Sequence, residues 1–306
     1  MTGRTVLLVV NPTATTTRPE LRDLIIAALE GTVTLDVRPT RGRGHATELA
    51  AEAVAQGRDA VVVLGGDGTA NEVVQALAHS TVPLGLVPGG GANVLARAVG
   101  LPADPVAATS RLLTALRSDR RRRIGLGSAD DRLFAFNAGM GFDAAVVARV
   151  ERDPARKQLL RQVAFASSAL GEWSAQRGRH DMLRVVLPDG VERLTDIALV
   201  ANTSPYTFLG DRPLTAHPGA SFDLGIDLLT VDRARLGRLA LVVAGALAGG
   251  RQFRLDGVRH DHDLPWLRVE AADRRSALPV HVDGDPLPPR RSVTLRSLPA
   301  ALDVLV

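Results

Sequence analysis

Three glycines, an aspartate and a threonine are gathered in the stretch GGDGT, Gly65 to Thr69, directly after the apolar run AVVVL. A glycine-rich turn that leads a strand into a helix brings unpaired backbone N–H groups and the positive end of the helix dipole to one point, and such a point binds phosphate. Gly65, Gly66 and Gly68 would let a polyphosphate approach the backbone, and Thr69 would cap the helix or touch a phosphate oxygen. Asp67 would repel phosphate unless a divalent cation lay between them. We therefore predict a phosphate site with a metal at Asp67; a purely structural turn is the alternative, although such a turn rarely needs a carboxylate among glycines.

A second glycine-rich loop follows the apolar run PLGLV, in the stretch PGGGANVLARAVGLP that begins at Pro88. This loop resembles the first one, because it also follows a strand and is rich in small or polar residues: Gly89, Gly90, Gly91 and Asn93. If the two preceding strands are neighbours, the loops form two walls of one cleft, and together they indicate a nucleotide site. The sequence has no GxxxxGKS or GxxxxGKT loop and no HRD and DFG motifs, which argues against P-loop proteins and protein kinases.

The elements that must position these loops alternate in type along the first part of the chain. Short apolar or β-branched runs and longer amphipathic runs follow one another in the order VLLVV, RPELRDLIIAALE, TVTLDV, HATELAAEAVAQG, AVVVL, ANEVVQALAHS and PLGLVP. Strands that are apolar throughout and separated by helices indicate a parallel sheet covered by helices on both faces. Ligands of such sheets bind at the carboxyl ends of the strands. We predict an α/β nucleotide-binding domain with a parallel sheet over residues 1–122.

The pattern changes after the arginine run at Arg120 to Arg123, because strand-like segments now follow one another directly. LPDG and VDGD have the composition of hairpin turns. We predict a mainly β domain, a sandwich, over residues 123–294, with helices at about 142–152, 155–177 and 232–248. The amphipathic face predicted for 154–177 packs against the sheet or, as a second interpretation, contacts a membrane.

Composition narrows the functional classes. The absence of cysteine excludes disulfide frameworks, thiolate catalysis and zinc ribbons. Aromatic residues make up only 3% of the chain and none interrupts the arginine run, so we expect no nucleic-acid partner. No apolar run approaches the roughly 18 residues of a spanning helix, and the first one is too short for a signal peptide. We expect a cytoplasmic protein, in which the arginine run is either a solvated connector or a contact for anionic headgroups.

Several motifs in a fixed order make the sequence similar to one family. They are VVNPTA at Val9, TRGRGHATELA at Thr40, GGDGTANEVVQAL at Gly65, PGGGANVLARAVGLP at Pro88, FNAGMGFDAAVVARVE at Phe136, PGASFDLGIDLL at Pro218 and VDGDPL at Val282. This order resembles the diacylglycerol kinase catalytic domain family, and within it the soluble bacterial diacylglycerol/lipid kinases, relatives of the sphingosine and ceramide kinases. NAD kinases share the GGDGT element, but the following NE, the NPxA start and the final DGxPL favour the lipid-kinase branch.

The resemblance implies an NAD kinase/diacylglycerol kinase-like fold in which the C-terminal residues, about 295–306, return to the first domain. It also implies ATP and Mg²⁺ as cofactors, and transfer of the γ-phosphoryl group to the hydroxyl of diacylglycerol or a related lipid. Asp67 would hold the magnesium ion. The residues that would contact ATP are Asn11, Thr40, Gly65, Gly66, Asp67, Gly68, Thr69, Asn71, Gly90, Gly91 and Asn93. The family implies a lipid substrate met at a membrane surface by transient, peripheral association, and it makes a homodimer a further expectation.

Four positions depart from the family pattern. Asp285 stands where the family's DGE motif has the glutamate that receives the hydroxyl proton, so the predicted catalytic base is one methylene shorter. An ordinary hairpin-turn aspartate is the alternative for Asp285. Leu224 stands in SFDLGID where the family has the second aspartate of DDG, so we expect its structural magnesium ion to be absent or relocated. Gly91 and Thr15 replace a common threonine and a common glycine.

These departures leave two other functions open. One is an NAD kinase-like phosphotransferase, and the other is a catalytically weak nucleotide- or lipid-binding protein. Among the histidines, His45 begins a helix and could touch a phosphate. His260 and His262 in RHDHD resemble part of a metal site, but no third ligand is evident in the sequence, so we expect them in a solvated turn.

Overall fold

The computed structural model describes residues 3–14, 18–141, 144, 183–273 and 276–306. The predicted helices at about 142–152 and 155–177 therefore lie outside the described residues, apart from Ala144. The chain divides into two compact units, which are described separately. Unit 1 comprises Met1–Leu126 and Pro299–Val306, and unit 2 comprises Gly127–Leu298.

Unit 1 is built on a parallel sheet. Its strands are β1 (Thr5–Val10), β2 (Thr34–Pro39), β3 (Ala60–Gly65) and β4 (Leu84–Pro88), in the order β2-β1-β3-β4. The neighbouring pairs are all parallel. The last residues of β18 (Ser292–Leu305) extend this sheet next to β4, with Val304 opposite Leu84. The chain order reverses direction between β1 and β3, which makes the space above their carboxyl ends a topological switch point.

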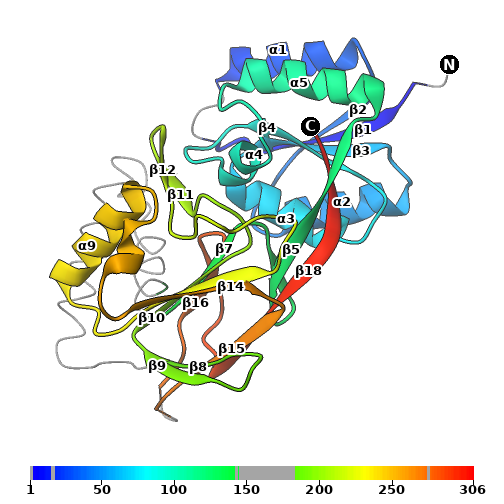
Figure 1. Ribbon diagram of the computed structural model, residues 1–306. Helices are drawn as coiled ribbons and strands as arrows, with labels where there is room; N and C mark the ends of the chain where they lie inside the picture. The colour runs from blue at the N-terminus through cyan, green and yellow to red at the C-terminus, as the bar shows by residue number, and fades with distance from the viewer. Residues whose placement is uncertain (1–2, 15–17, 142–143, 145–182, 274–275) are drawn as a thin grey trace. The chain divides into compact units, whose positions relative to one another are not determined.

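Helices cover both faces of this sheet, as Figure 1 shows. The helices α1 (Pro19–Glu30) and α5 (Pro105–Ser118) lie over one face, and α2 (His45–Ala55) and α3 (Asp67–Leu77) over the other. Leu8, Val62 and Leu64 pack with Ile25 of α1 and Leu112 of α5 in one core cluster. The intervening strand residues are buried as well. Burial on both faces is why β1 and β3 are apolar over almost their whole length, whereas the edge strand β2, which is more exposed, also carries polar residues.

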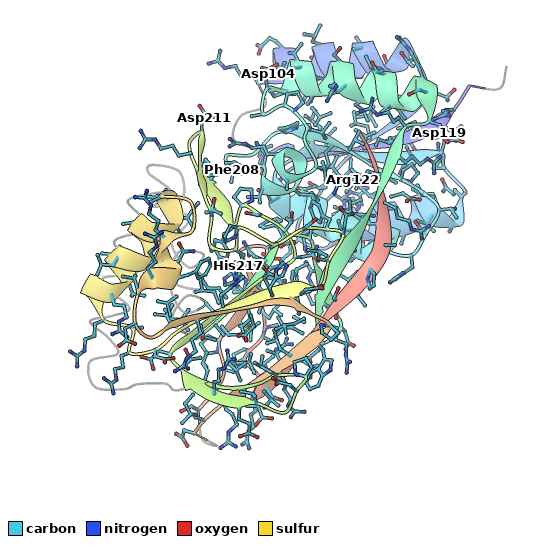
Figure 2. All side chains as sticks on the ribbon, viewed as in Figure 1. Asp104, Asp119, Arg122, Phe208, Asp211 and His217 are labelled. Atoms are coloured by element: carbon cyan, nitrogen blue, oxygen red, sulfur yellow. The ribbon has the colours of Figure 1, made fainter. Side chains whose placement is uncertain are left out.

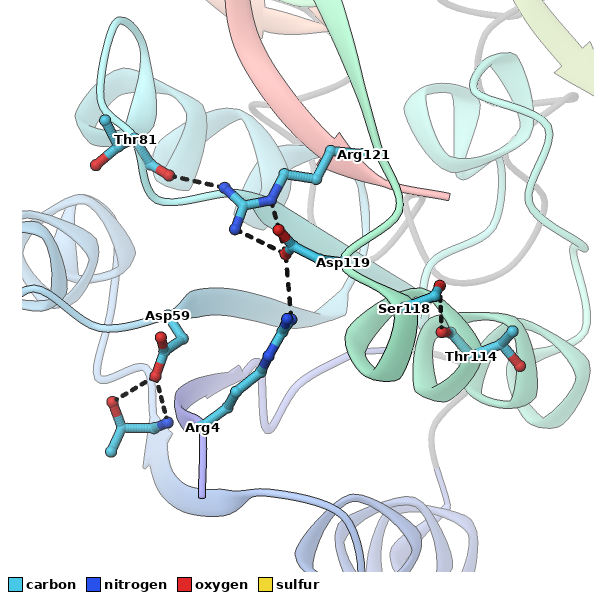
Figure 3. Close-up of polar contacts among 8 residues, drawn as sticks. Arg4, Asp59, Thr81, Thr114, Ser118, Asp119 and Arg121 are labelled. Carbon is cyan, nitrogen blue, oxygen red and sulfur yellow. Dashed lines mark hydrogen bonds and ion pairs between the residues drawn. The ribbon is translucent and has the colours of Figure 1, made fainter. Parts of the chain in front are cut away.

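Both ends of α5 are fixed by residues close to them in the sequence. Asp104 accepts a hydrogen bond from Ala107 N at 2.8 Å and caps α5, which has proline at its first position. After α5, Asp119 takes a left-handed conformation and accepts hydrogen bonds from Arg4 and Arg121 (Figure 3). Arg121 also donates to the carbonyl of Thr81 at 3.1 Å. These contacts join the chain entering β1 to the chain leaving α5.

Unit 2 is an antiparallel sandwich. One sheet has the order β14-β13-β10-β7-β16-β17, and the other contains the first part of β18 followed by β15, β8 and β9, with β5 and β6 attached. Alternate residues of both sheets, such as Met140, Val200 and Leu228 facing Val185 and Leu267, form one core cluster. The strands are β5 (Arg121–Ala129), β6 (Arg132–Phe134), β7 (Asn137–Gly141), β8 (Leu183–Val186), β9 (Glu192–Thr195), β10 (Ile197–Ala201), β13 (Ile226–Val231), β14 (Val258–Leu264), β15 (Trp266–Ala271), β16 (Val280–Val282) and β17 (Asp285–Pro286). The predicted fold class, a parallel α/β unit and a mainly β sandwich, is confirmed.

Two predicted hairpins and one predicted helix are present in unit 2. LPDG joins β8 to β9, and VDGD joins β16 to β17 with positive φ at Asp283 and Gly284. The helix α9 (Leu236–Leu247) and the short 3-10 helix η1 (Arg251–Arg254) pack on the outer face of the six-stranded sheet through Leu239, Val242 and Phe253. The two-stranded ribbon of β11 (Thr207–Leu209) and β12 (Arg212–Leu214) completes the unit.

The prediction that His260 and His262 lie in a solvated turn is wrong. Both belong to strand β14, which pairs antiparallel with β13. Polar residues dominate this segment because β14 is an edge strand of its sheet. Within the described part of the chain, no helix combines the length and the apolar character needed to span a membrane.

Candidate functional site

The first cluster of predicted site residues lies at the switch point of the unit 1 sheet. Asn11 follows β1, and its backbone N–H donates to the carbonyl of Leu64 on β3 at 3.1 Å. Its side-chain Nδ2 donates to Thr69 Oγ1, also at 3.1 Å. Asn11 Oδ1 accepts hydrogen bonds from the amide and the hydroxyl of Thr13. The asparagine therefore links the end of β1 to the start of α3, where the structure places the GGDGT loop.

The GGDGT loop is an uncapped helix N-terminus. Gly65 is the last residue of β3, Gly66 is extended, and Asp67 is the first residue of α3. The N-cap residue of α3 is Gly66, which has no side chain to cap the helix. An α-helix leaves its first N–H groups without an intrahelical partner, so this end offers donors and a positive dipole end to an anion. Thr69 does not cap the helix; its hydroxyl accepts from Asn11 instead.

The second loop lies directly against the first. The amide of Gly89 donates to the carbonyl of Gly65 at 2.8 Å, which continues the pairing of β3 with β4. A Cβ atom on Gly90 would lie 2.7 Å from the Cα of Gly66, closer than real Cβ atoms approach other atoms. The expected two walls of a cleft are thus the ends of adjacent strands, and glycine is required where they touch.

Asn93 shapes the second loop from within. Its side chain is buried, accepts from Gly90 N at 2.9 Å and donates to Gly90 O at 2.7 Å. The residue takes a left-handed conformation, φ 48°, immediately before α4 (Val94–Ala98). Asn93 therefore holds the loop closed, a structural role beside the ATP contact that the resemblance implies.

The Asp67 carboxylate is held between the two loops. It is half-buried, and its Oδ1 accepts a hydrogen bond from Leu95 N, in the first turn of α4, at 3.2 Å. A hollow next to it is lined by Gly66, Asp67, Asn93 and Leu95 among others. A carboxylate oxygen beside a glycine-rich backbone suits a hard cation that prefers oxygen ligands and bridges to phosphate. The residues present therefore fit a magnesium–nucleotide complex.

Thr40 and His45 lie at the same edge of the sheet. Thr40 follows β2 and donates its amide to the carbonyl of Val10 at 2.8 Å. His45 begins α2, and its Nδ1 accepts from the amide of Arg41 at 3.1 Å. All four parallel strands thus end in predicted site residues.

Asn71 and Glu72 in the first turns of α3 have structural contacts. Asn71 is 1% exposed, and Gln75 donates to its carbonyl at 3.0 Å. The Glu72 carboxylate accepts hydrogen bonds from the amides of Gly44 at 2.9 Å and Ala46 at 3.1 Å, which lie at the N-terminus of α2. This cap could not be predicted from the sequence, because the capping signals in a sequence lie within the capped helix, whereas Glu72 belongs to α3.

The two aspartates of the VDGD hairpin in unit 2 have different environments. Asp283 is buried and accepts hydrogen bonds from the amides of Ala135, Phe136 and Asn137 at 2.7, 3.0 and 3.0 Å. Asp285 is half-buried and lies 3.6 Å from Arg132 in an ion pair. The hairpin is therefore anchored by Asp283, and Asp285 keeps a side chain that solvent reaches. The two predicted catalytic aspartates belong to different units: Asp67 to unit 1 and Asp285 to unit 2.

Besides Asp285, two further departures from the family pattern can be located. Gly91 is exposed in the second loop, and Leu224 is an exposed residue in a turn before β13. Thr15 lies outside the described residues. The expectation about the structural magnesium ion at Leu224 stays a prediction.

Comparisons with known proteins identify the family. The model of the diacylglycerol kinase catalytic domain matches residues 5–129. A relative in Pseudomonas aeruginosa (strain UCBPP-PA14), named "Probable lipid kinase YegS-like", is 32% identical over 280 residues, which cover 89% of this chain and 85% of the relative. The chain belongs to the diacylglycerol kinase catalytic domain family. A second relative of this kinase, with the same name, in Xanthomonas campestris pv. campestris (strain 8004), is 30% identical over 89% of the chain and 86% of its own length.

Solved structures show that this family member has the expected fold. A diacylglycerol kinase from Bacillus anthracis str. Sterne superposes with a TM-score of 0.73 at 17% identity, over 100% of this chain and 97% of that chain. Yeast NADH kinase superposes with a TM-score of 0.52 at 12% identity, over 100% and 84%. Both likenesses concern the fold, and they agree with a parallel α/β unit joined to an antiparallel one.

Proposed function

We propose that this kinase transfers the γ-phosphoryl group of ATP to the hydroxyl of a lipid, diacylglycerol or a closely related one. One observation carries the proposal more than any other. The two glycine loops meet at Gly66 and Gly90 and hold the Asp67 carboxylate beside an uncapped helix N-terminus. This is the arrangement that a magnesium-bound polyphosphate requires. The family and the names of the relatives support a lipid as the acceptor.

Different residues of unit 1 would have different roles in binding the nucleotide. The glycines remove side chains from the loop surface, and the first amides of α3 offer hydrogen bonds to phosphate oxygens. Asp67 would hold Mg²⁺, which neutralises charge on the phosphates when bound. Asn11 and Thr69 are already hydrogen-bonded to each other, so their side chains are positioned before ATP arrives. Phosphoryl transfer depends mainly on such positioning.

Asp285 would receive the proton of the lipid hydroxyl. The carboxylate is accessible, and the buried neighbour Asp283 fixes the hairpin that carries it. Arg132 pairs with Asp285 and would hold the carboxylate in one orientation until the lipid hydroxyl binds next to it. A lipid acceptor also implies that a cytoplasmic protein visits the membrane surface transiently. A homodimer remains a prediction.

The proposal is tested by incubating the purified protein with labelled ATP, Mg²⁺ and mixed micelles containing a panel of hydroxylated lipids. We expect label to be transferred to diacylglycerol or a related lipid. Asp67→Asn should lower the rate at least about 100-fold, because a bound metal contributes several kcal/mol to the transition state. Asp104→Asn is the matched control, since asparagine also caps α5.

Two results would contradict the proposal. One is the absence of transfer to every lipid by folded protein that binds ATP, and the other is undiminished transfer by Asp67→Asn. A parallel reaction with NAD in place of lipid tests the NAD kinase-like alternative, for which label in NAD alone is the diagnostic outcome.

The role of Asp285 makes a separate prediction. Asp285→Asn should reduce kcat by about 10²- to 10⁴-fold, the usual contribution of a positioned base, while the KM for ATP stays nearly constant. Asp285→Glu should change kcat by less than about 10-fold if aspartate is already an efficient base. If the unsubstituted protein is almost inactive and Asp285→Glu raises its kcat by about 100-fold or more, the protein is instead a catalytically weak nucleotide- or lipid-binding protein.

A further inference from the structure

Three side chains of unit 2 with metal-binding atoms converge at the outer edge of the six-stranded sheet. His260 and His262 lie on β14, and Asp227 lies on the neighbouring strand β13. His260 Nε2 is 3.1 Å from Asp227 Oδ2, and His262 Nδ1 is 2.8 Å from Asp227 Oδ1. One ligand atom from each residue lies within 4.8 Å of the others. None of the three has a role in the nucleotide site of unit 1.

An irregularity in strand pairing produces this convergence. The register of β13 with β14 shifts between Ile226 and Leu228, so Asp227 has no regular partner in the ladder. Such a bulge redirects side chains. Asp263, φ 57°, accepts from Gly225 N and donates its own amide to Asp227 Oδ1 at 3.1 Å, which closes the bulge around the carboxylate. The intervening Asp261 does not join the cluster; it forms an ion pair with Arg193.

The Asp227 carboxylate is in an environment that favours a cation. Its side chain is 0% exposed, and within the described part of the chain its ion-pair partners are the two histidines alone. A buried carboxylate is costly unless positive charge compensates it. Neutral imidazoles can supply hydrogen bonds to the carboxylate but no full positive charge, whereas a divalent ion bound by all three residues supplies the charge and accepts both imidazole lone pairs.

The distances fit a transition metal. A tetrahedral zinc ion has bonds of about 2.0 to 2.1 Å to histidine nitrogen and to carboxylate oxygen, which places neighbouring ligand atoms about 3.3 Å apart. The observed separations of 2.8 and 3.1 Å run from the two nitrogens to different oxygens of Asp227, and one ligand atom from each residue lies within 4.8 Å of the others. Small rotations of the carboxylate and of the two rings would bring the three atoms to the tetrahedral spacing. Two imidazoles and one carboxylate suit zinc and similar divalent ions, whereas magnesium prefers oxygen ligands only.

We propose that Asp227, His260 and His262 form a binding site for a divalent transition metal ion of the zinc class, which joins β13 to β14. The site goes beyond phosphoryl transfer, because its nitrogen ligands distinguish it from the magnesium site proposed at Asp67. The side chain of His262 is 45% exposed, so an ion can reach the site from solvent. Three protein ligands leave a fourth tetrahedral position for water.

The surroundings hold the ligands in place. The ring of Phe253 lies 4.7 Å from the ring of His260, and Gly219 packs so closely on His262 that a Cβ atom would lie 3.1 Å from its ring. Behind His260 lies the buried His217, labelled in Figure 2, whose Nε2 contacts the carbonyl of Leu199 at 3.2 Å. A site whose rings are packed before the ion arrives loses less entropy on binding.

The test uses the full chain without an affinity tag, treated with a chelator and then dialysed free of it. Titration with Zn²⁺, followed by calorimetry, and with Co²⁺, followed by its visible absorption, should give saturable binding of one ion per chain. Excess Mg²⁺ should not compete. His262→Gln should weaken binding by at least 10- to 100-fold, the range seen when even an outer partner of a metal ligand is removed. This variant should fold, because its side chain is nearly half exposed.

Asp261→Asn is the matched control, because this carboxylate lies between the two histidines in the chain and pairs with Arg193 instead. Its metal affinity should equal that of the parent, with circular dichroism confirming that both variants are folded. Absence of one-to-one binding in the parent would overturn the proposal and leave Asp227 as the acceptor of two histidine hydrogen bonds. Equal affinity of His262→Gln and the parent would overturn it as well. Kinase activity is not part of the readout, so failure here is distinct from failure of the proposed function.

Discussion

Gly66 and Gly90 show how single residues decide the geometry of the proposed nucleotide site. Each belongs to the loop that follows one strand of a parallel pair, and the two backbones approach until a Cβ on Gly90 would lie 2.7 Å from Gly66 Cα and 3.0 Å from Asn93 Oδ1. Gly66 Cα is a backbone atom, and the Asn93 side chain is held by two hydrogen bonds to Gly90, so the contact is relieved by moving the loops apart. The glycines therefore allow the two loops to pack together, in addition to the access for phosphate that we propose.

Gly90→Ala should separate the two loops. We expect a loss of about 1 to 3 kcal/mol in the free energy of unfolding, the usual cost of overpacking, and weaker ATP binding. Chemical denaturation and calorimetric titration with ATP measure the two effects. Gly68→Ala is the control for stability, because its Cβ would meet no atom within 4 Å. Equal stability of Gly90→Ala and the parent would mean that the loops are not in contact.

The glycine loops could be located from the sequence because the pattern that identifies them is contiguous: a strand, a glycine-rich turn and a helix follow one another in the chain. It could not show that Asp67 accepts from Leu95 N, or that Asp227 joins two histidines more than thirty positions later. Those contacts depend on the register of neighbouring strands and on a bulge, and a histidine pair in a polar stretch looks the same in a turn and in an edge strand.

At the scale of elements, Glu72 connects the two helices that cover one face of the unit 1 sheet. The carboxylate of this α3 residue accepts from two amides at the N-terminus of α2, and the hydroxyl of Thr47 on α2 donates to the Glu72 carbonyl at 2.8 Å. The negative charge of Glu72 also interacts favourably with the positive end of the α2 dipole. Because α3 begins with the GGDGT loop, the cap fixes the helix that carries Asp67.

Glu72→Ala should therefore lower the free energy of unfolding by about 1 to 3 kcal/mol, because it leaves two amides without their acceptor. Glu72→Gln should cost less, since the amide oxygen still accepts one hydrogen bond. Urea denaturation of the purified variants gives the comparison. Glu52→Ala, an exposed position in α2, should stay within about 0.5 kcal/mol of the parent. A Glu72→Ala variant as stable as this control would refute the capping role.

The elements themselves were largely predictable. Continuous apolar strands and amphipathic helices gave the parallel sheet, because both faces of that sheet are buried, and turn composition gave the LPDG and VDGD hairpins. The two histidines of β14 were assigned to a turn because its sequence, VRHDHDL, has neither an apolar run nor apolar alternation. It is a strand through its pairing with the buried β13, which is a tertiary cause that propensity cannot supply.

At the scale of the whole molecule, the strand β18 contributes to the cores of both units. Leu295 packs in the core of the sandwich, and Leu305 packs in the core of the parallel sheet. Hydrogen bonds tie its last part into unit 1, where His79 N donates to Ala301 O at 2.7 Å and Arg123 Nε donates to Ala300 O at 2.8 Å.

Two substitutions within this one strand should act on different units. Leu305→Ala should speed amide hydrogen exchange in β1 and β3, and Leu295→Ala should speed it in β8 and β15, each with a cost of about 2 to 5 kcal/mol for the core it enters. Mass spectrometry of peptide fragments resolves the two regions. If either substitution accelerates exchange equally in both sets of strands, the units do not unfold separately.

The position of residues 299–306 also bears on how the protein is made. They follow unit 2 along the chain, yet they complete the sheet of unit 1 next to β4. A growing chain on the ribosome therefore displays β4 as an open edge during the whole synthesis of unit 2, and an open edge invites pairing with other chains. The newborn protein should need protection from aggregation until its final strand emerges. A premature stop shortly before residue 299 would keep every predicted site residue and still leave that edge uncovered.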